Sequence, residues 1–263
     1  MADMRQHFRS NEQAFVQQAV DWVAQAVDEY RLVLTPFLNP RERYILQTLV
    51  NRAASLTLRT NGLIADAEMQ RGLILPDYID IETLDNSVYE MQLVEIVYPK
   101  KFLTLQHRTI LGTLMHNGIE RDRVGDIVTD DNERWQFVTT PVVADYVNQH
   151  IERIGGAKVH FKNVAVDQAL VPNVEWETVD ILATSTRLDN VVASTYQLSR
   201  SIAKQMVEHG DVKLNWAEQL HPDVTLEPGD LLSVRGHGRM QVMADNGLTR
   251  QDKHKLTVAR LKK

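Results

Sequence analysis

Basic and hydroxyl side chains gather at the predicted start of a helix near residue 200. The segment Leu198–Gly210 has Ser199 in position to cap a helix, followed by Arg200 and, one turn later, Lys204. A helix N-terminus presents unpaired N–H groups and a partial positive charge, so this pattern predicts an anion site. Arg187, at the start of a preceding short helix, is expected to complete it. Taken singly, the same cations also fit an ordinary solvated helix face.

The charge of the chain is distributed unevenly along its length. Across 263 residues, 29 Lys and Arg stand against 35 Asp and Glu, a formal net charge of −6 that argues against nucleic-acid binding. Residues 1–186 carry 17 basic and 26 acidic side chains, whereas residues 187–263 carry 12 and 9. The balance is therefore −9 in the first part and +3 in the second, which leaves a basic end suited to phosphates.

Several kinds of chemistry are excluded by what the sequence lacks. The chain has no cysteine, so it has no disulfide, thiolate metal site or cysteine nucleophile. The nine histidines show no zinc-binding spacing, and neither a Gly-x-Ser-x-Gly elbow nor a Walker loop is present. We therefore expect no metal and no cofactor.

The sequence gives no sign of a membrane segment. No apolar run approaches the ~18–20 residues that span a bilayer. The first eight residues carry an acid and lack the apolar core of an export signal. We expect a soluble, cytoplasmic protein that binds no membrane.

Residues 1–80 predict a mainly helical N-terminal domain. Apolar residues at three-and-four spacing predict a helix after Ser10, with Ser10 and Gln13 placed as a capping box. A second helix fits Pro40–Asn51, where Asn39 is positioned to cap. Two short apolar runs, 56–58 and 73–75, look like strands or extended segments.

Residues 81–175 predict a domain of six elements in the order β-α-β-β-α-β. This is the order of the ferredoxin-like split βαβ unit, which RNA-recognition motifs also use. The predicted elements are a strand at 94–98, a helix at 106–117, strands at 126–129 and 135–139, a helix from 140 to 151 and a strand at 158–162.

Basic and apolar side chains alternate along the last of these strands. Lys158, His160 and Lys162 point to one face and Val159 and Phe161 to the other, so a basic row on an exposed sheet face is possible. A solvated face is the equal alternative. Trp135 and Phe137 also share a face, and for them we favour burial in the core.

Residues 180–245 carry a longer signature. It consists of Arg187-Leu188-Asp189, Ser199-Arg200, Gly210-x-Val212-x-Leu214-Asn215, and Pro228-Gly229-Asp230 with Val234-Arg235. This combination resembles the small α/β RNA-binding domain named after ribosomal protein S-four. The pattern departs at Trp216, where many such domains have glycine. The basic stretch 246–263 follows as a C-terminal tail.

The resemblance implies that the domain clamps structured RNA through charge and shape. The implied RNA contacts are Arg187, Ser199, Arg200, Lys204, Lys213 and Asn215, with Arg235 and Arg239 as secondary candidates and Lys158, His160 and Lys162 from the middle sheet.

The chain as a whole, an α+β protein, resembles the bacterial YlmH family. The stretches that carry this resemblance are 36–42, 107–114, 117–119, 125–127 and the final domain. Members of that family are linked to the large ribosomal subunit and to ribosome-associated quality control, with ribosomal RNA and tRNA as partners. Some members were named from a gene cluster near cell-division genes.

Two other functions remain as alternatives. A pseudouridine synthase would use an aspartate after Arg-Leu, but Asp189 lies inside the RNA-binding signature, with too few residues after it for a catalytic domain. An adaptor would instead use the acidic N-terminal part to bind proteins. We favour a non-enzymatic RNA-binding monomer.

Overall fold

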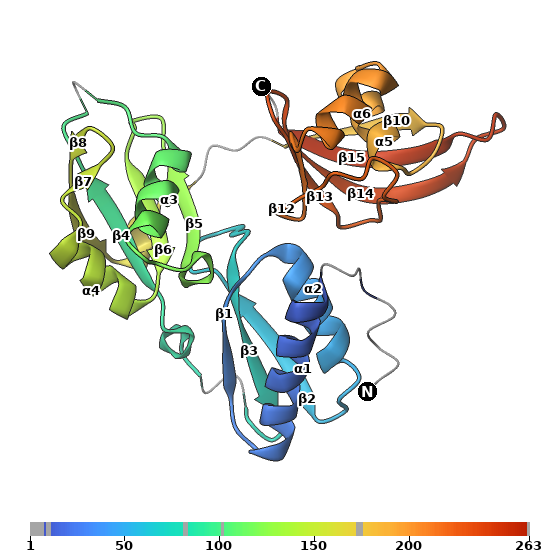
Figure 1. Cartoon of the computed structure of the whole chain (residues 1–263). Helices are drawn as coiled ribbons and strands as arrows, with labels where there is room; N and C mark the ends of the chain where they lie inside the picture. The colour runs from blue at the N-terminus through green and yellow to red at the C-terminus, as the bar shows by residue number, and fades with distance from the viewer. Residues whose placement is uncertain (1–7, 9–11, 81–83, 101–102, 172–175, 262–263) are drawn as a thin grey trace. The chain divides into compact units, whose positions relative to one another are not determined.

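The computed structural model describes residues 8, 12–80, 84–100, 103–171 and 176–261. The chain divides into two compact units, residues 1–173 and 174–263 (Figure 1). The first unit contains the N-terminal and middle domains, and the second contains the C-terminal domain.

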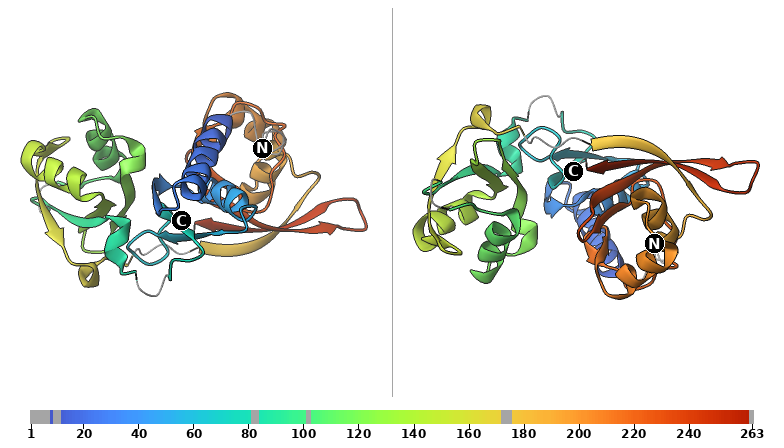
Figure 2. Two further views of the ribbon diagram at one scale, coloured as in Figure 1. Left: turned by 90° about the horizontal axis from the view of Figure 1, so that it is seen from below. Right: turned by 90° about the horizontal axis from the view of Figure 1, so that it is seen from above.

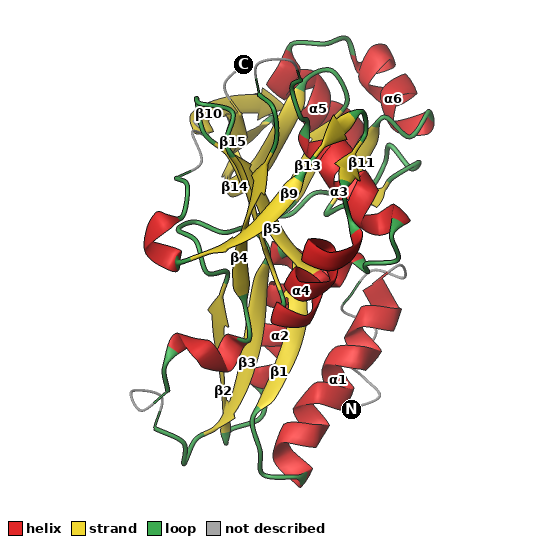
Figure 3. Cartoon of the chain, turned by 90° about the vertical axis from the view of Figure 1, so that its left-hand side faces the viewer, coloured by secondary structure: helices red, strands yellow, loops and turns green. Residues whose placement is uncertain are grey.

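The N-terminal domain packs two helices against a three-stranded antiparallel sheet of order β1-β3-β2 (Figure 3). Asn39 and Glu42 cap the second helix with the reciprocal hydrogen bonds of a capping box, which confirms the predicted start. The cap predicted at Ser10 lies outside the described residues. The elements are α1 (Gln13–Asp28), β1 (Val33–Leu38), α2 (Pro40–Val50), β2 (Leu56–Asn61) and β3 (Gln70–Pro76).

Strand β1 was not predicted, and the domain is therefore richer in strand than the sequence indicated. The strand contains Pro36, which cannot donate a ladder hydrogen bond. It lies at the edge of the sheet, and its pairing with β3 shifts register between Leu34 and Phe37. Edge strands and bulges are the positions at which sheets tolerate proline.

The middle domain has the predicted ferredoxin-like order. Its four-stranded antiparallel sheet runs β5-β6-β4-β9, and α3 and α4 cover one face. Trp135 and Phe137 lie in the core between sheet and helices, as predicted. The elements are η4 (Asn86–Tyr89), β4 (Gln92–Val97), α3 (His107–His116), η5 (Arg121–Arg123), β5 (Val124–Thr129), β6 (Trp135–Thr139), α4 (Pro141–His150), β7 (Arg153–Ile154), β8 (Ala157–Lys158), β9 (His160–Val164) and η6 (Val166–Gln168).

The C-terminal unit is a six-stranded antiparallel sheet of order β10-β15-β14-β13-β11-β12 with two helices packed on one face. Its longest feature is the hairpin formed by β14 and β15 (Figure 2). The elements are β10 (Trp176–Ala183), α5 (Leu188–Tyr196), α6 (Arg200–Glu208), β11 (Val212–Leu214), β12 (Ala217–Glu218), β13 (Leu231–Val234), β14 (Gly238–Leu248) and β15 (His254–Leu261).

The stretch 246–263 is not a separate tail. Strand β14 continues through Leu248, and β15 lies inside the sheet between β10 and β14. Leu256 and Val258 are buried in the core of the unit, because their alternation places both on the face that the helices cover. Lys262 and Lys263 lie outside the described residues.

Candidate nucleic-acid interface

Helices α5 and α6 begin where the sequence predicts them to begin. Arg187 is the residue before α5, and Ser199 is the residue before α6. The Ser199 hydroxyl accepts a hydrogen bond from the backbone N–H of Ile202 at 3.2 Å, which confirms it as an N-cap. Ser199 therefore fixes the start of α6 and places Arg200 in its first turn.

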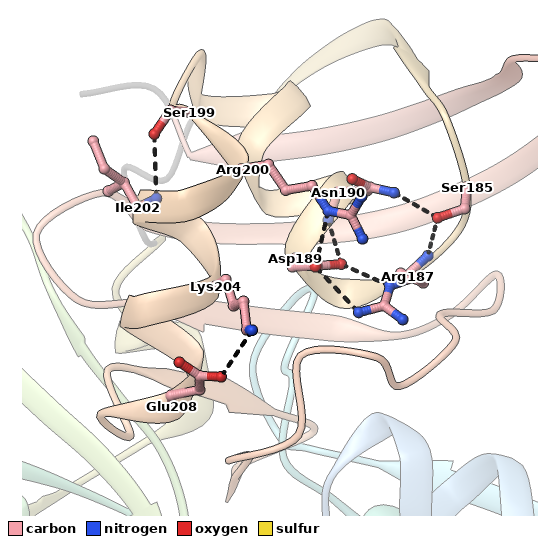
Figure 4. A network of polar contacts seen from close by, with 9 residues as sticks. All are labelled: Ser185, Arg187, Asp189, Asn190, Ser199, Arg200, Ile202, Lys204 and Glu208. Atoms are coloured by element: carbon pink, nitrogen blue, oxygen red, sulfur yellow. Dashed lines mark hydrogen bonds and ion pairs between the residues drawn. The ribbon is translucent and has the colours of Figure 1, made fainter.

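A buried carboxylate holds two of the candidate arginines together (Figure 4). Arg187 donates from Nε and Nη2 to the two oxygens of Asp189, at 3.1 and 3.2 Å. Arg200 donates from Nε to Oδ2 of the same carboxylate at 3.1 Å. The Asp189 side chain is only 1% exposed, whereas those of Arg187 and Arg200 are 36% and 57% exposed. The carboxylate thus lies beneath the arginines and leaves their heads in contact with solvent.

Asp189 is held in its charged form. Burial alone would raise the pKa of this carboxyl, but the hydrogen bonds from Arg187 and Arg200 outweigh it, and the pKa is lowered. The Asp189 hydrogen bond in turn raises the pKa of Arg187. A single negative charge therefore faces two positive charges, and the cluster keeps a net positive charge directed outward.

The other basic candidates of this unit are spread over its surface. Lys204 forms an ion pair with Glu208 at 3.5 Å, one turn further along α6. Arg235 is highly exposed and contacts Asp211 at 3.1 Å. Lys213 is exposed on β11, between two buried residues of that strand.

Asn215 has an internal role that the sequence did not indicate. Its amide donates to Asp230 Oδ1 at 2.8 Å and accepts from the Leu231 backbone N–H at 3.0 Å. The same Asp230 accepts from the Glu227 backbone N–H, within the turn formed by residues 227–230. Gly229 has φ +93, as a type II turn requires. Asn215 therefore joins two turns of the sheet.

The middle sheet does not present the basic row that its sequence alternation suggested. The strand begins at His160, and Lys158 belongs instead to the short ribbon β7–β8, opposite Arg153. The break occurs at Val159, which is buried and donates its N–H to the Glu152 carbonyl. His160 and Lys162 remain exposed on the sheet face away from the helices.

That face of the sheet lacks the features of an RNA-recognition surface. On the two central strands, its residues are Leu93, Glu95, Val97, Gln136 and Val138. RNA-recognition motifs stack bases on aromatic rings at such positions, and none of these five is aromatic. Gln136 is fully buried and hydrogen-bonds to Glu95 and to the backbone of residues 168 and 170.

Apolar side chains of the N-terminal domain cover part of the same face. One cluster joins Phe37, Ile64, Ala67 and Met69 of that domain to four residues of the sheet, which are Leu93, Val128, Val138 and Val164. A Cβ on Gly125 would lie 2.8 Å from a ring carbon of Phe37, so glycine is required for this close approach. The covered part of the sheet is therefore a domain interface within the first unit.

Asp126 joins the same two domains, and no role for it was predicted from the sequence alone. Its carboxylate accepts from the backbone N–H groups of Glu68 and Met69 at 2.7 and 2.9 Å. Burial raises the pKa of Asp126, because desolvation outweighs those hydrogen bonds. Only its position after Gly125, in a stretch shared with the YlmH family, marked it in the sequence.

The described residues also bear on metal binding and membrane insertion. In that part of the chain, no group of three or more His, Asp or Glu side chains is arranged to hold a metal ion. Nor is any of its helices long and apolar enough to cross a membrane.

Family models match three successive parts of the chain. Residues 11–79 match "YlmH, N-terminal", residues 85–168 match "Putative RNA-binding domain in YlmH", and residues 186–232 match the S4 domain. The small ribosomal subunit protein uS4 of Thermoanaerobacter sp. is 38% identical over 63 residues, which are 24% of this chain and 31% of that protein. The fold and the arginine cluster thus define an S4-domain protein.

Relatives that match along more of the chain identify its family. Ribosome-associated protein quality control protein P2 of Bacillus subtilis is 36% identical over 262 residues, which are 100% of both chains. The solved structure of cell division protein ylmH from Streptococcus pneumoniae aligns with a TM-score of 0.54 and 31% identity, covering 63% of this chain and 98% of that one. The chain belongs to the YlmH family.

Proposed function

We propose that this protein is a non-enzymatic RNA-binding protein that acts in ribosome-associated quality control in the cytoplasm. In this proposal its C-terminal unit binds structured ribosomal RNA and tRNA on the large ribosomal subunit. The name of the B. subtilis relative and the RNA-binding and S4 family models support this function. Because its domains follow one another along the chain without needing a symmetric partner, we propose that it binds as a monomer.

The observation that carries the proposal is the pair of arginines held by Asp189. Arginine presents a planar group of N–H donors that suits phosphate oxygens. The buried carboxylate restrains both guanidinium groups, so less conformational freedom is lost when they bind phosphate. We propose Arg187 and Arg200 as the principal RNA contacts, with Lys204, Lys213, Arg235 and Arg239 contributing charge around them.

The geometry of Asp189 favours binding over catalysis. An aspartate that attacks a base or sugar must reach its substrate, but this carboxylate is 1% exposed and both of its oxygens accept hydrogen bonds from arginine. We therefore interpret Asp189 as a positioning residue for the arginines. A pseudouridine-synthase-like activity is not favoured.

Co-sedimentation with purified large ribosomal subunits tests the proposal. The double variant Arg187→Ala, Arg200→Ala is expected to lose subunit binding by at least about tenfold, because each charge-assisted contact contributes roughly 1.5–3 kcal/mol. Arg52→Ala, Arg59→Ala removes the same charge from exposed positions of the N-terminal domain and serves as the matched control.

The outcomes separate the RNA clamp from a protein adaptor. The control variant is expected to bind subunits as the wild type does. If the Arg187→Ala, Arg200→Ala variant also binds normally, with its fold intact by circular dichroism, then the RNA-clamp proposal is wrong. Loss of binding by the Arg52→Ala, Arg59→Ala variant alone would instead favour an adaptor surface on the N-terminal domain.

A further inference from the structure

The turn between β11 and β12 places a tryptophan where the backbone favours glycine. Leu214 pairs with Ala217, so Asn215 and Trp216 form a two-residue hairpin loop. Both have positive φ, +49 for Asn215 and +68 for Trp216, as a type I′ turn requires. Asn-Gly is the favoured pair in this turn, because a Cβ at the second position is strained. Asn215 fits the pattern and Trp216 does not.

Strain of this kind persists where the surrounding structure holds it in place, and it often marks a functional site. Here the Arg239 guanidinium lies over the Trp216 ring, 5.8 Å from its centroid. Trp216 is only partly buried and is not part of the core of the unit. The tryptophan is thus held in a defined orientation at the surface without serving as a core residue.

Arg239, which lies over this ring, shares one face of the sheet with Lys213. Lys213 pairs with Glu218 on one side and Ser233 on the other, and Ser233 pairs with Arg239, so the four residues form a row across β12, β11, β13 and β14. Residues directly opposite one another on antiparallel strands share a face, and two strand spacings separate Lys213 from Arg239 by about 10 Å. Val212 and Leu214 point into the core, which puts Lys213 and its row on the opposite face.

We propose that Trp216 stacks on an unpaired base of the bound RNA, while Lys213 and Arg239 contact the phosphates on either side of it. An aromatic ring between basic side chains is the combination that single-stranded nucleic acid binding uses. Unstacked bases in RNA loops and bulges are bound by aromatic rings and arginine planes, whereas paired bases are not accessible in this way. This inference rests on the proposed function and defines the RNA further: the ligand contains a bulged or looped nucleotide.

Two short RNA hairpins that differ by one bulged nucleotide test the inference with the full-length protein. The wild type is expected to bind the bulged RNA roughly tenfold more tightly, as one base–aromatic stack allows. Trp216→Gly is expected to bind both RNAs equally, at the affinity that the wild type has for the fully paired RNA. Trp216→Phe keeps a ring and is expected to retain part of the preference.

The control is an aromatic residue in a similar setting elsewhere in the chain. Tyr44, on α2, also lies beneath a guanidinium, with Arg41 5.4 Å from its ring centroid. Tyr44→Ala is expected to leave the preference for the bulge unchanged. Because glycine relieves the strained turn, Trp216→Gly is expected to melt no lower than the wild type.

A readout on the RNA covers the case in which Trp216→Gly fails to fold. With 2-aminopurine at the bulge, wild-type protein is expected to quench its fluorescence through stacking, and Trp216→Phe is expected to quench it less. If the wild type binds both hairpins equally, if Trp216→Gly keeps the preference, or if the probe is not quenched, then the inference is wrong and the proposed function stands. If the wild type binds neither RNA, both are wrong.

Discussion

The middle sheet and the start of helix α6 both carry basic side chains, but they place the neighbouring carboxylates differently. On the sheet, Lys162 stands opposite Glu95, which also forms an ion pair with Arg134 at 2.6 Å. At α6, Asp189 lies beneath Arg187 and Arg200 and is almost inaccessible. An incoming phosphate therefore meets acid and base side by side on the sheet, whereas the carboxylate shared by Arg187 and Arg200 is buried beneath their exposed heads.

The two regions also differ in what covers them. Apolar residues of the N-terminal domain cover part of the sheet face, which also holds the buried amide of Gln136 and carries no aromatic ring on its central strands. The arginine heads of the C-terminal cluster remain exposed. A fold shared with RNA-recognition motifs thus does not by itself provide their binding surface, since that depends on the residues at a few positions.

The largest expected effect comes from removing the ring that covers the sheet. Phe37 is 1% exposed, so Phe37→Ala is expected to lower the free energy of unfolding of the first unit by about 3–5 kcal/mol. Chemical denaturation measures this loss. Val97→Ala, at an exposed position of the same sheet, is the control and should change stability by less than about 0.5 kcal/mol.

The same variant tests whether the covered face is a hidden RNA surface. At a temperature where Phe37→Ala stays folded, its affinity for structured RNA is expected to equal that of the wild type. Tighter binding would mean that the N-terminal domain masks an RNA site, and the contrast between the two regions would then be wrong.

Replacing the buried carboxylate is expected to have the next largest effect. Asp189→Asn leaves two arginines without their shared counter-charge and should lower the free energy of unfolding of the C-terminal unit by about 1–3 kcal/mol. RNA affinity should fall because the arginines lose their orientation. The salt dependence should stay unchanged, since both cations are still present.

A second aspartate provides the control for this variant. Asp211 contacts the highly exposed Arg235, and exposed ion pairs contribute little. Asp211→Asn is expected to keep the stability and the RNA affinity of the wild type. A shallower salt dependence for Asp189→Asn would show that the carboxylate acts in some way other than positioning two RNA-contacting arginines.

A smaller effect is expected from the cap of α6. Ser199→Ala removes the acceptor of the Ile202 N–H and should cost about 1 kcal/mol of stability, measured by thermal or chemical unfolding. RNA affinity should change little, because the hydroxyl is engaged within the protein. Ser199→Asp, which can still cap, is expected to restore the stability. A loss of RNA affinity without a loss of stability would instead make Ser199 a direct RNA contact.

The smallest expected effects are two opposite pH dependences. The pKa of Asp189 is lowered from 3.8, so its contribution to stability is present above that pH and is lost as the pH falls through the folded-state pKa. The pKa of Asp126 is raised from 3.8, so the folded state binds more protons and stability falls as the pH rises through this range.

Urea unfolding from about pH 3 to about pH 6 measures both dependences. Relative to the wild type, Asp189→Asn should remove a rise in stability with pH, and Asp126→Asn should remove a fall. Changes of the same sign in both variants would contradict the assigned environments of the two carboxyl groups.

The order of elements in the middle domain and the two helices of the C-terminal domain could be predicted because they depend on local patterns. Two examples are the shared, buried face of Trp135 and Phe137 and the helix cap at Ser199, and both predictions are confirmed. Strand β1 could not be predicted because a proline at position 36 argues against a strand when only the local sequence is considered. The fold tolerates Pro36 because β1 lies at the edge of the sheet and pairs irregularly with β3.

The basic residues of the candidate site could be named from the sequence, but the side chains that they contact could not. Asp189 belongs to the sequence signature, but its link to Arg200 joins residues eleven apart in sequence and depends on how two helices pack. The covering of the sheet by Phe37 likewise depends on a contact between distant segments. Asn215 matched a sequence signature, but only the fold shows that its amide binds Asp230.

The salt dependence of RNA binding tests the contrast between the two regions most directly. Affinity for a structured ribosomal RNA fragment would be measured across salt concentrations for the wild type, for Arg187→Ala, Arg200→Ala and for His160→Ala, Lys162→Ala. The slope of log K against log salt is negative, and each lost phosphate contact reduces its magnitude by about 0.7–0.9. The arginine variant is expected to lose about two such contacts and the sheet variant none. A reduced slope for the sheet variant, with the arginine variant unchanged, would contradict the assignment of RNA binding to the C-terminal cluster.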